Sequence, residues 1–219
     1  MTFLLLPGCT ERAGPGTQSR ILLMGDSMMA ANRNIGLSVA DAIESRLGES
    51  VIDRSVPAAR ILHALPISGS LGLDIDQQYQ AGSWDWVVLN GGGNDLLFGC
   101  GCALCDHKID RLISADGRRG AIPGLVSRLR HGGARVIYTG YLRSPGRWSL
   151  IDGCRAVGNE LDRRIARLAG LDRGVFFLAL DDLVPFADRS YHAPDLIHPS
   201  PKGSDAIGRR IAALIDAAG

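Results

Sequence analysis

Residues 20–27 read RILLMGDS, a continuous apolar run that ends at a glycine, a carboxylate and a hydroxyl. An unbroken apolar run of this length is typical of a parallel strand that is buried on both faces. Asp or Ser after such a strand commonly caps the first turn of a helix. The stretch therefore predicts a buried strand that leads directly into a helix, with Ser27 at the junction.

Segments with strand and helix patterns alternate along the rest of the chain. Further apolar runs predict strands at residues 50–56, 84–90, 134–141 and 174–180. Apolar residues at helical spacing predict helices over 35–47, 121–133, 155–170 and from Pro201, after Ser200, to the end of the chain. Such alternation implies right-handed crossovers and a parallel sheet with helices on both faces.

Polar loops follow the first three predicted strands. Gly25-Asp26-Ser27 follows the first, residues 55–59 follow the second, and GGGND (91–95) follows the third. Ligands of parallel sheets bind at the carboxyl ends of the strands, so we expect these loops to share one edge. Consecutive glycines allow close approach of the backbone to a ligand, and the amide of Asn94 offers two donors. Asn94 and Asp95 are equally suited to capping a helix.

A serine hydroxyl needs an adjacent base, which in turn needs a third group to orient it. Of the five histidines, only His198 has a carboxylate at a useful spacing, because Asp195 precedes it by three residues just before the last helix. An isolated Asp-x-x-His is also common in ordinary surface loops. The combination of this motif with Gly-Asp-Ser after the first strand and Gly-x-Asn-Asp after the third favours a catalytic interpretation.

These blocks resemble those of the SGNH (GDSL-like) hydrolases, in the same order along residues 20–217. The matching blocks are Gly25-Asp26-Ser27, Gly92-Gly93-Asn94-Asp95 and Asp195-Leu196-Ile197-His198-Pro199. The resemblance implies an α/β fold, a three-layer α/β/α sandwich with a five-stranded parallel sheet in flavodoxin-like strand order. It also implies an esterase that needs no metal and no organic cofactor.

By the same resemblance, Ser27 is the nucleophile, His198 the base and Asp195 the residue that orients the base. The backbone N–H groups of Ser27 and Ala58 and the amide of Asn94 would stabilise the oxyanion. Asp26, Gly93 and Asp95 would bind substrate or support the catalytic residues. The family normally has glycine at the position of Ala58, and alanine would cost roughly 1 kcal/mol there if the backbone needs a positive φ.

Bulk composition limits the other classes of function. The chain has 219 residues, 46% of them hydrophobic, which suits one domain, assigned to residues 20–219. Its 24 basic and 23 acidic residues give a net charge of +1, without the basic excess of a nucleic-acid binder. The expected partner is a small-molecule ester.

Residues 1–19 resemble a truncated lipoprotein signal and a flexible leader, with Cys9 as the lipidation candidate and membrane anchor. This segment predicts that the protein lies in the bacterial cell envelope, in the periplasm and anchored by a lipid. The alternative is a cytoplasmic protein whose N-terminus is a frayed tail. The remaining cysteines fit two disulfides, with Cys154 as the natural long-range partner. The candidates are Cys100, Cys102, Cys105 and Cys154. Zinc bound by three of these thiolates and His107 is the competing interpretation.

The leading hypothesis is a serine esterase that forms an acyl-enzyme on Ser27. Its substrate would be a small carboxylic ester or thioester, a lysolipid or an acetylated glycan. The alternative is a catalytically weak binding or scaffold module of the cell envelope on the same fold, which the alanine at position 58 favours.

Overall fold

The structure, a computed structural model, describes residues 19–146 and 149–219. The lipidation candidate Cys9 and nearly all of the predicted leader lie outside the described residues. None of the helices that the structure describes is both long enough and apolar enough to cross a membrane.

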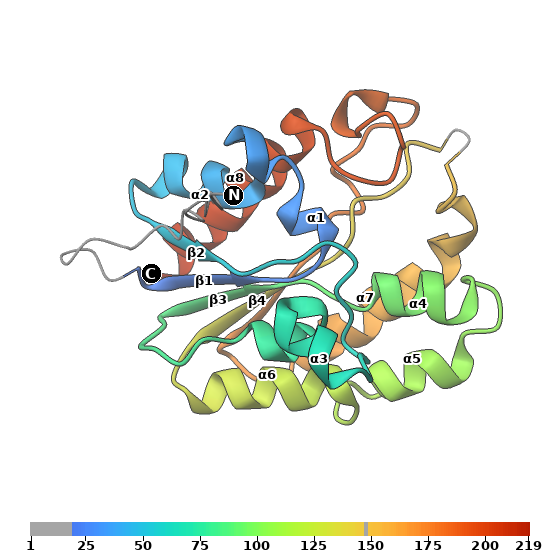
Figure 1. The fold of residues 1–219 in the computed structure, drawn as a ribbon, viewed down its shortest axis with the longest axis horizontal. Coiled ribbons are helices and arrows are strands. Elements are labelled where there is room, and N and C mark those ends of the chain that lie inside the picture. Colours follow the sequence, from blue (N-terminus) through green and yellow to red (C-terminus); the bar gives the residue numbers. More distant parts are fainter. Residues whose placement is uncertain (1–18, 147–148) are drawn as a thin grey trace, which may run out of the picture.

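Five parallel strands form one sheet in the order β2-β1-β3-β4-β5, which is the predicted flavodoxin-like order (Figure 1). Every residue of the two central strands β1 and β3 is buried, which explains their continuous apolar sequences. The strands span Ile21–Met24 (β1), Val51–Asp53 (β2), Trp86–Leu89 (β3), Arg135–Thr139 (β4) and Val175–Leu178 (β5). The predicted α/β/α sandwich is confirmed.

Helices cover both faces of the sheet (Figure 1). One face carries α1 (Ser27–Ala30), α2 (Val39–Leu47) and α8 (Pro201–Ala218). The other carries α4 (Gly93–Cys100), α5 (Asp106–Leu112), α6 (Ala121–His131) and α7 (Arg155–Ala169). The shorter helical turns are α3 (Pro66–Ser68), Arg33–Ile35, Gly69–Leu73, Ile75–Gln78, Asp152–Cys154 and Arg189–Tyr191.

The predicted start of the second helix was wrong. Ile35 has helical spacing to Val39, but it lies in a separate short turn and is 57% exposed. Helix α2 begins after Ser38, because Ser38 and Asp41 form a reciprocal capping box that satisfies the first free N–H groups. Local capping therefore outweighed the apolar periodicity.

Two disulfides connect the segments that follow α4, in agreement with the predicted pairing of four cysteines. Cys100 pairs with Cys105 within one loop, and Cys102 pairs with Cys154 across 52 residues. The second bridge joins the end of α4 to the beginning of α7. With all four sulfurs in disulfides, no thiolate remains there for zinc, and the zinc interpretation is wrong.

Candidate active site

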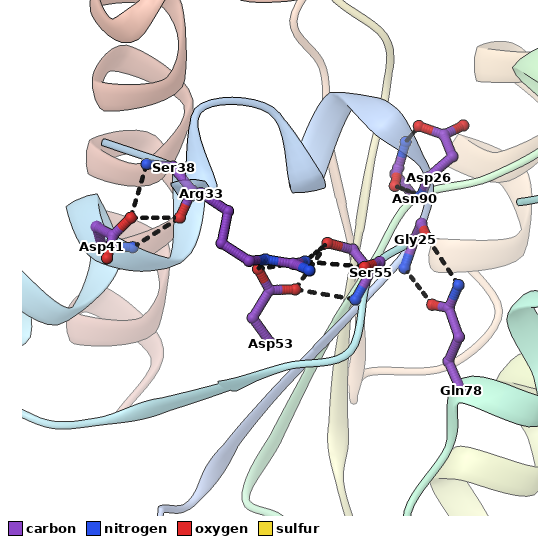
Figure 2. A network of polar contacts seen from close by, with 9 residues as sticks. All are labelled: Gly25, Asp26, Arg33, Ser38, Asp41, Asp53, Ser55, Gln78 and Asn90. Atoms are coloured by element: carbon purple, nitrogen blue, oxygen red, sulfur yellow. Dashed lines mark hydrogen bonds and ion pairs between the residues drawn. The ribbon is translucent and has the colours of Figure 1, made fainter. Parts of the chain in front are cut away.

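The turn after β1 requires glycine at position 25. Gly25 has φ +152°, and a Cβ there would lie 1.8 Å from Oδ1 of Asn90. The Gln78 side chain holds both polar groups of Gly25, since Oε1 accepts its N–H at 2.7 Å and Nε2 donates to its carbonyl at 2.9 Å (Figure 2). Gly25 and Gln78 therefore fix the backbone conformation of the turn that ends strand β1.

Asp26 is fully buried and caps α1. Its Oδ1 accepts from the N–H of Met28 at 3.0 Å and from Nδ2 of Asn90 at 2.9 Å, and its Oδ2 accepts from the Tyr141 hydroxyl at 2.5 Å. Asn90 also accepts the backbone N–H of Asp26, as Figure 2 shows. Burial raises the pKa of Asp26, while these hydrogen bonds and the nearby imidazole of His198 oppose the rise.

Tyr141, just beyond β4, connects the first polar loop to the third. Its hydroxyl donates to Asp26 and accepts the N–H of Gly93 at 2.9 Å, at the first residue of α4. Burial and the Asp26 carboxylate raise the pKa of Tyr141 well above its ordinary value, so the phenol stays protonated and remains a donor. Gly93, predicted as a supporting residue, thus binds the same tyrosine as Asp26.

The second polar loop packs against the other two. Its Val56 N–H donates to the Gly25 carbonyl at 3.0 Å. Nδ2 of Asn94 donates to the Ala59 carbonyl at 3.0 Å, which leaves the second amide hydrogen of Asn94 available. Ala58, between these contacts, has φ +64° and therefore occupies the left-handed region where glycine is favoured.

Asp95 fixes the continuation of the second loop. The two oxygens of its buried carboxylate accept the N–H groups of Ile61 and Leu62 at 3.0 and 2.8 Å. Burial raises the pKa of Asp95, and the two N–H donors oppose that rise. Asp95 therefore acts as a link between loops and does not cap the helix in which it lies.

Asp195 and His198 form the predicted pair. Oδ2 of Asp195 lies 2.6 Å from Nδ1 of His198, and Oδ1 accepts the N–H groups of Ile197 and His198. Partial burial acts to raise the pKa of Asp195, but the hydrogen bonds from His198 and the two N–H groups prevail and lower it. Leu196, between the pair, has φ +57°, a backbone conformation that costs energy for leucine.

The His198 segment lies beside the segment that follows Ser27. Nδ2 of Asn32 donates to the carbonyl of Pro199 at 3.0 Å and to the hydroxyl of Ser204 at 2.9 Å. In Figure 1 helix α1 and the beginning of α8 lie on the same side of the sheet. The imidazole of His198 is also near enough to Asp26 to lower its pKa. The Asp195–His198 segment thus lies with the three polar loops at one end of the sheet.

The hydroxyl of Ser27 is half-buried, and among the described residues it makes no hydrogen bond to the predicted base His198. In the described ranges 19–146 and 149–219 it has no hydrogen-bond partner, and Nε2 of His198 has none either. Within the same ranges, no protein group engages the backbone N–H groups of Ser27 and Ala58. The arrangement thus offers a hydroxyl, an imidazole held by a carboxylate, and free N–H donors.

Three contributors were not predicted from the sequence: Gln78, Asn90 and Tyr141. Asn90 carried a weak signal in the sequence, because it is a polar residue at the end of an apolar strand run. The structure shows that its side chain is completely buried. The other two come from segments that only the folded chain brings to the first loop. Among the residues that the structure describes, no cluster of side chains suits a metal ion.

The fold is an α/β/α sandwich with a parallel sheet, in which ligands bind at the carboxyl ends of the strands, the edge where the candidate residues gather. The family model for GDSL-like lipases and acylhydrolases matches residues 23–206, so the chain belongs to that family. No curated protein matches the chain in sequence.

Solved structures with the same fold include several esterases. An acetyl-xylooligosaccharide esterase from Geobacillus stearmophilus has 16% identity and a TM-score of 0.64, over 91% of this chain and 95% of that one. A family two carbohydrate esterase from Clostridium thermocellum has 20% identity and a TM-score of 0.62, over 94% and 66%. A GDSL-like lipase from Bacteroides thetaiotaomicron has 17% identity and a TM-score of 0.60, over 92% and 89%. At identities of 16–20%, these similarities establish a shared fold and nothing about the substrate of this chain.

Proposed function

We propose that the protein is a serine esterase that hydrolyses carboxylic esters or thioesters through an acyl-enzyme on Ser27. The observation that carries the proposal is the convergence of four separate loops, bonded to one another, around an unengaged serine hydroxyl. Family membership supports hydrolytic chemistry in general, and the arrangement of this chain's residues supports the particular roles.

In the proposed mechanism Ser27 attacks the ester carbonyl while Nε2 of His198 accepts its proton. Asp195 holds Nδ1 of the imidazole and stabilises the positive charge that forms. His198 then gives the proton to the leaving alcohol or thiol, and the acyl group remains on Ser27. A water molecule, deprotonated by His198, hydrolyses that ester and restores the serine.

The oxyanion of each tetrahedral intermediate would receive N–H groups from Ser27, Ala58 and Asn94. One such donor contributes about 3 kcal/mol to the transition state in hydrolases of this kind. The hydrogen bonds that fix Asp26 and Asn94 hold these donors in place before the substrate arrives. Preorganisation of this kind avoids the cost of ordering them during the reaction.

The exposure of the Asp195–His198 pair supports a catalytic role over a stabilising one. The two side chains are 45% and 40% exposed. Exposed ion pairs contribute only about 0–1 kcal/mol to stability, so the fold gains little from this geometry. Their position beside the Ser27 turn instead suits proton transfer with substrate from solvent.

The experiment that tests the proposal is hydrolysis of p-nitrophenyl acetate by the wild type and by Ser27→Ala. We expect the wild type to be active and Ser27→Ala to retain less than about a thousandth of kcat, as for loss of a serine nucleophile. The matched control is Ser45→Ala, an exposed serine on α2, which should behave as the wild type. Unchanged activity in Ser27→Ala would eliminate the proposal.

We further propose that the protein works in the bacterial cell envelope. The two disulfides support an oxidising compartment. A lipid anchor on Cys9 would place it at a membrane surface. Mass spectrometry of the protein from its native host, showing a diacylated Cys9 at the new N-terminus, is the expected result; an intact Met1 would exclude the anchor.

One observation favours a second candidate, a weakly catalytic binding or scaffold module. Ala58 has the left-handed backbone that glycine provides without strain, so its methyl group stands next to a proposed oxyanion donor. A wild type inert on all acyl lengths that still binds an envelope glycan or lipid would favour this candidate.

A further inference from the structure

The segment between β4 and α7 runs beside the loop that carries the proposed base (Figure 1). Oγ of Ser149, a half-buried residue of this segment, donates to the carbonyl of Leu196 at 2.8 Å, across 47 residues of sequence. Leu196 stands between Asp195 and His198. Within the described part of the chain, no other group donates to its carbonyl. The serine hydroxyl therefore contacts the Asp195–His198 motif from outside the polar loops.

One peptide group connects Ser149 to the carboxylate of Asp195. The peptide bond after Leu196 joins that carbonyl to the N–H of Ile197, which donates to Oδ1 of Asp195 at 2.9 Å. Because a peptide group is planar, a hydrogen bond that fixes its carbonyl also fixes the direction of its N–H. A bond accepted by the carbonyl also polarises the N–H and strengthens it as a donor. The other oxygen of this carboxylate holds Nδ1 of His198 at 2.6 Å.

The backbone at Leu196 needs such a contact to keep its conformation. Its φ of +57° lies in the left-handed region, which is strained for a residue with a side chain. Rotation toward a relaxed conformation would turn the N–H of Ile197 away from Asp195. The hydrogen bond from Ser149 opposes this rotation, because the rotation would break it.

Ser149 is itself held by the short turn that precedes α7. Its N–H donates to Oδ2 of Asp152 at 3.1 Å, and its carbonyl accepts the N–H of Asp152 at 3.1 Å. Cys154, two residues farther on, is bonded to Cys102, just after α4. The hydroxyl that reaches Leu196 therefore belongs to a turn that a disulfide ties to the opposite side of the site.

We infer that Ser149 is a positioning residue, whose hydroxyl orients the Asp195–His198 pair for proton transfer through the intervening peptide group. The inference rests on the proposed esterase function and adds a residue that acts through another. In that function His198 transfers the proton both in acylation of Ser27 and in hydrolysis of the acyl-enzyme. Loss of its orientation slows both steps, so kcat falls while KM changes little.

The test measures kcat and KM for p-nitrophenyl acetate in Ser149→Val and Ser149→Thr. The two side chains have nearly the same shape, but only threonine keeps the hydroxyl. We expect valine to lower kcat about tenfold, the upper range for one neutral hydrogen bond, with KM within about twofold of the wild type. Threonine should keep kcat within about twofold. Ser149→Ala, which adds no atoms, repeats the measurement if Ser149→Val does not fold.

Ser190→Ala is the matched control. It removes an exposed hydroxyl from the loop that carries Asp195, but the bonds of this hydroxyl go to the side chains of Asp188 and Lys202. It should behave as the wild type in both kinetic constants. Urea unfolding of every variant accompanies the kinetics, because a serine that only stabilises the fold would lower the unfolding midpoint and leave kcat of the folded protein unchanged.

Unchanged kcat in a folded Ser149→Val or Ser149→Ala would overturn the inference and leave the proposed esterase intact. Equal losses of kcat in the valine and threonine variants would also overturn it, because the hydroxyl would then not be the cause. A wild type that does not hydrolyse the ester would refute the proposed function together with the inference. Ser27→Ala, run in parallel, shows that the measured turnover belongs to the proposed site.

Discussion

Replacing Tyr141 with phenylalanine removes one hydroxyl that serves two partners, the buried Asp26 and the half-buried Gly93. Asp26 loses a hydrogen bond of 2.5 Å to its carboxylate, and the N–H of Gly93 loses its acceptor. A hydrogen bond to a charged group contributes roughly 1.5–3 kcal/mol, and an unsatisfied buried N–H costs roughly 1–3 kcal/mol. With some overlap between these effects, we expect the free energy of unfolding to fall by about 3 kcal/mol at pH 8.

This destabilisation should depend on pH in a defined direction. The pKa of Asp26 is raised in the folded protein, so the stability associated with it is present below its unfolded value and is lost as pH rises through the folded pKa. Loss of the Tyr141 donor raises that pKa further and makes the loss at high pH larger. The wild type and Tyr141→Phe should therefore differ most at pH 8 and least in acid.

Urea unfolding at pH 8 and pH 4 measures both effects. The matched control is Tyr138→Phe, which removes a fully buried hydroxyl whose hydrogen bond goes to the carbonyl of Gly91 instead of a carboxylate. We expect about 1 kcal/mol from this neutral bond, without a pH dependence. Equal destabilisation of Tyr141→Phe at both pH values, or a value no larger than the control's, would refute the reasoning.

Three further predictions follow from single features. Ala58→Gly should raise the free energy of unfolding by roughly 0.5 kcal/mol in urea, because relief of the left-handed alanine exceeds the entropy cost of glycine; a loss of stability would contradict it. Burial raises the pKa of Asp162 to about 6, against the opposing attraction of Arg143, so the free energy of unfolding should fall by about 2 kcal/mol as pH rises from 4 to 7. Asp162→Asn should remove this contribution, so between pH 4 and 7 its free energy of unfolding should fall by about 2 kcal/mol less than that of the wild type; an equal fall in both proteins would exclude the assignment. Replacing Cys102 and Cys154 with serine opens a bridge across 52 residues and should cost about 4 kcal/mol by chain entropy, measured by thermal and urea unfolding; a cost below 1 kcal/mol would exclude the bridge as a major constraint.

The strands were predictable because burial on both faces leaves a simple signature. Residues 21–24 and 86–89 are buried at every position, so their sequences are apolar throughout. Helix α4 was less predictable, since it begins at Gly93 within a glycine-rich segment that reads as a loop. The structure shows that Asn94 and Asp95 lie inside the helix and bond to the second loop.

Candidate site residues were predictable to the extent that their roles depend on local spacing. Asp195 and His198 contact each other within one turn of chain, so the sequence alone placed them together. Tyr141 and Gln78 contact the first loop across 115 and 53 residues, and their roles depend on tertiary packing that no local pattern records. The catalytic roles of Ser27 and its proposed partners stay predictions.

The most direct test of the central claim is covalent labelling with an alkyl fluorophosphonate, followed by peptide mapping. The account predicts one phosphonyl adduct, on Ser27, and labelling at least a hundredfold slower in His198→Ala, because the hydroxyl then lacks its base. A wild type that hydrolyses esters yet carries the adduct on another residue, or labels equally fast without His198, would contradict it.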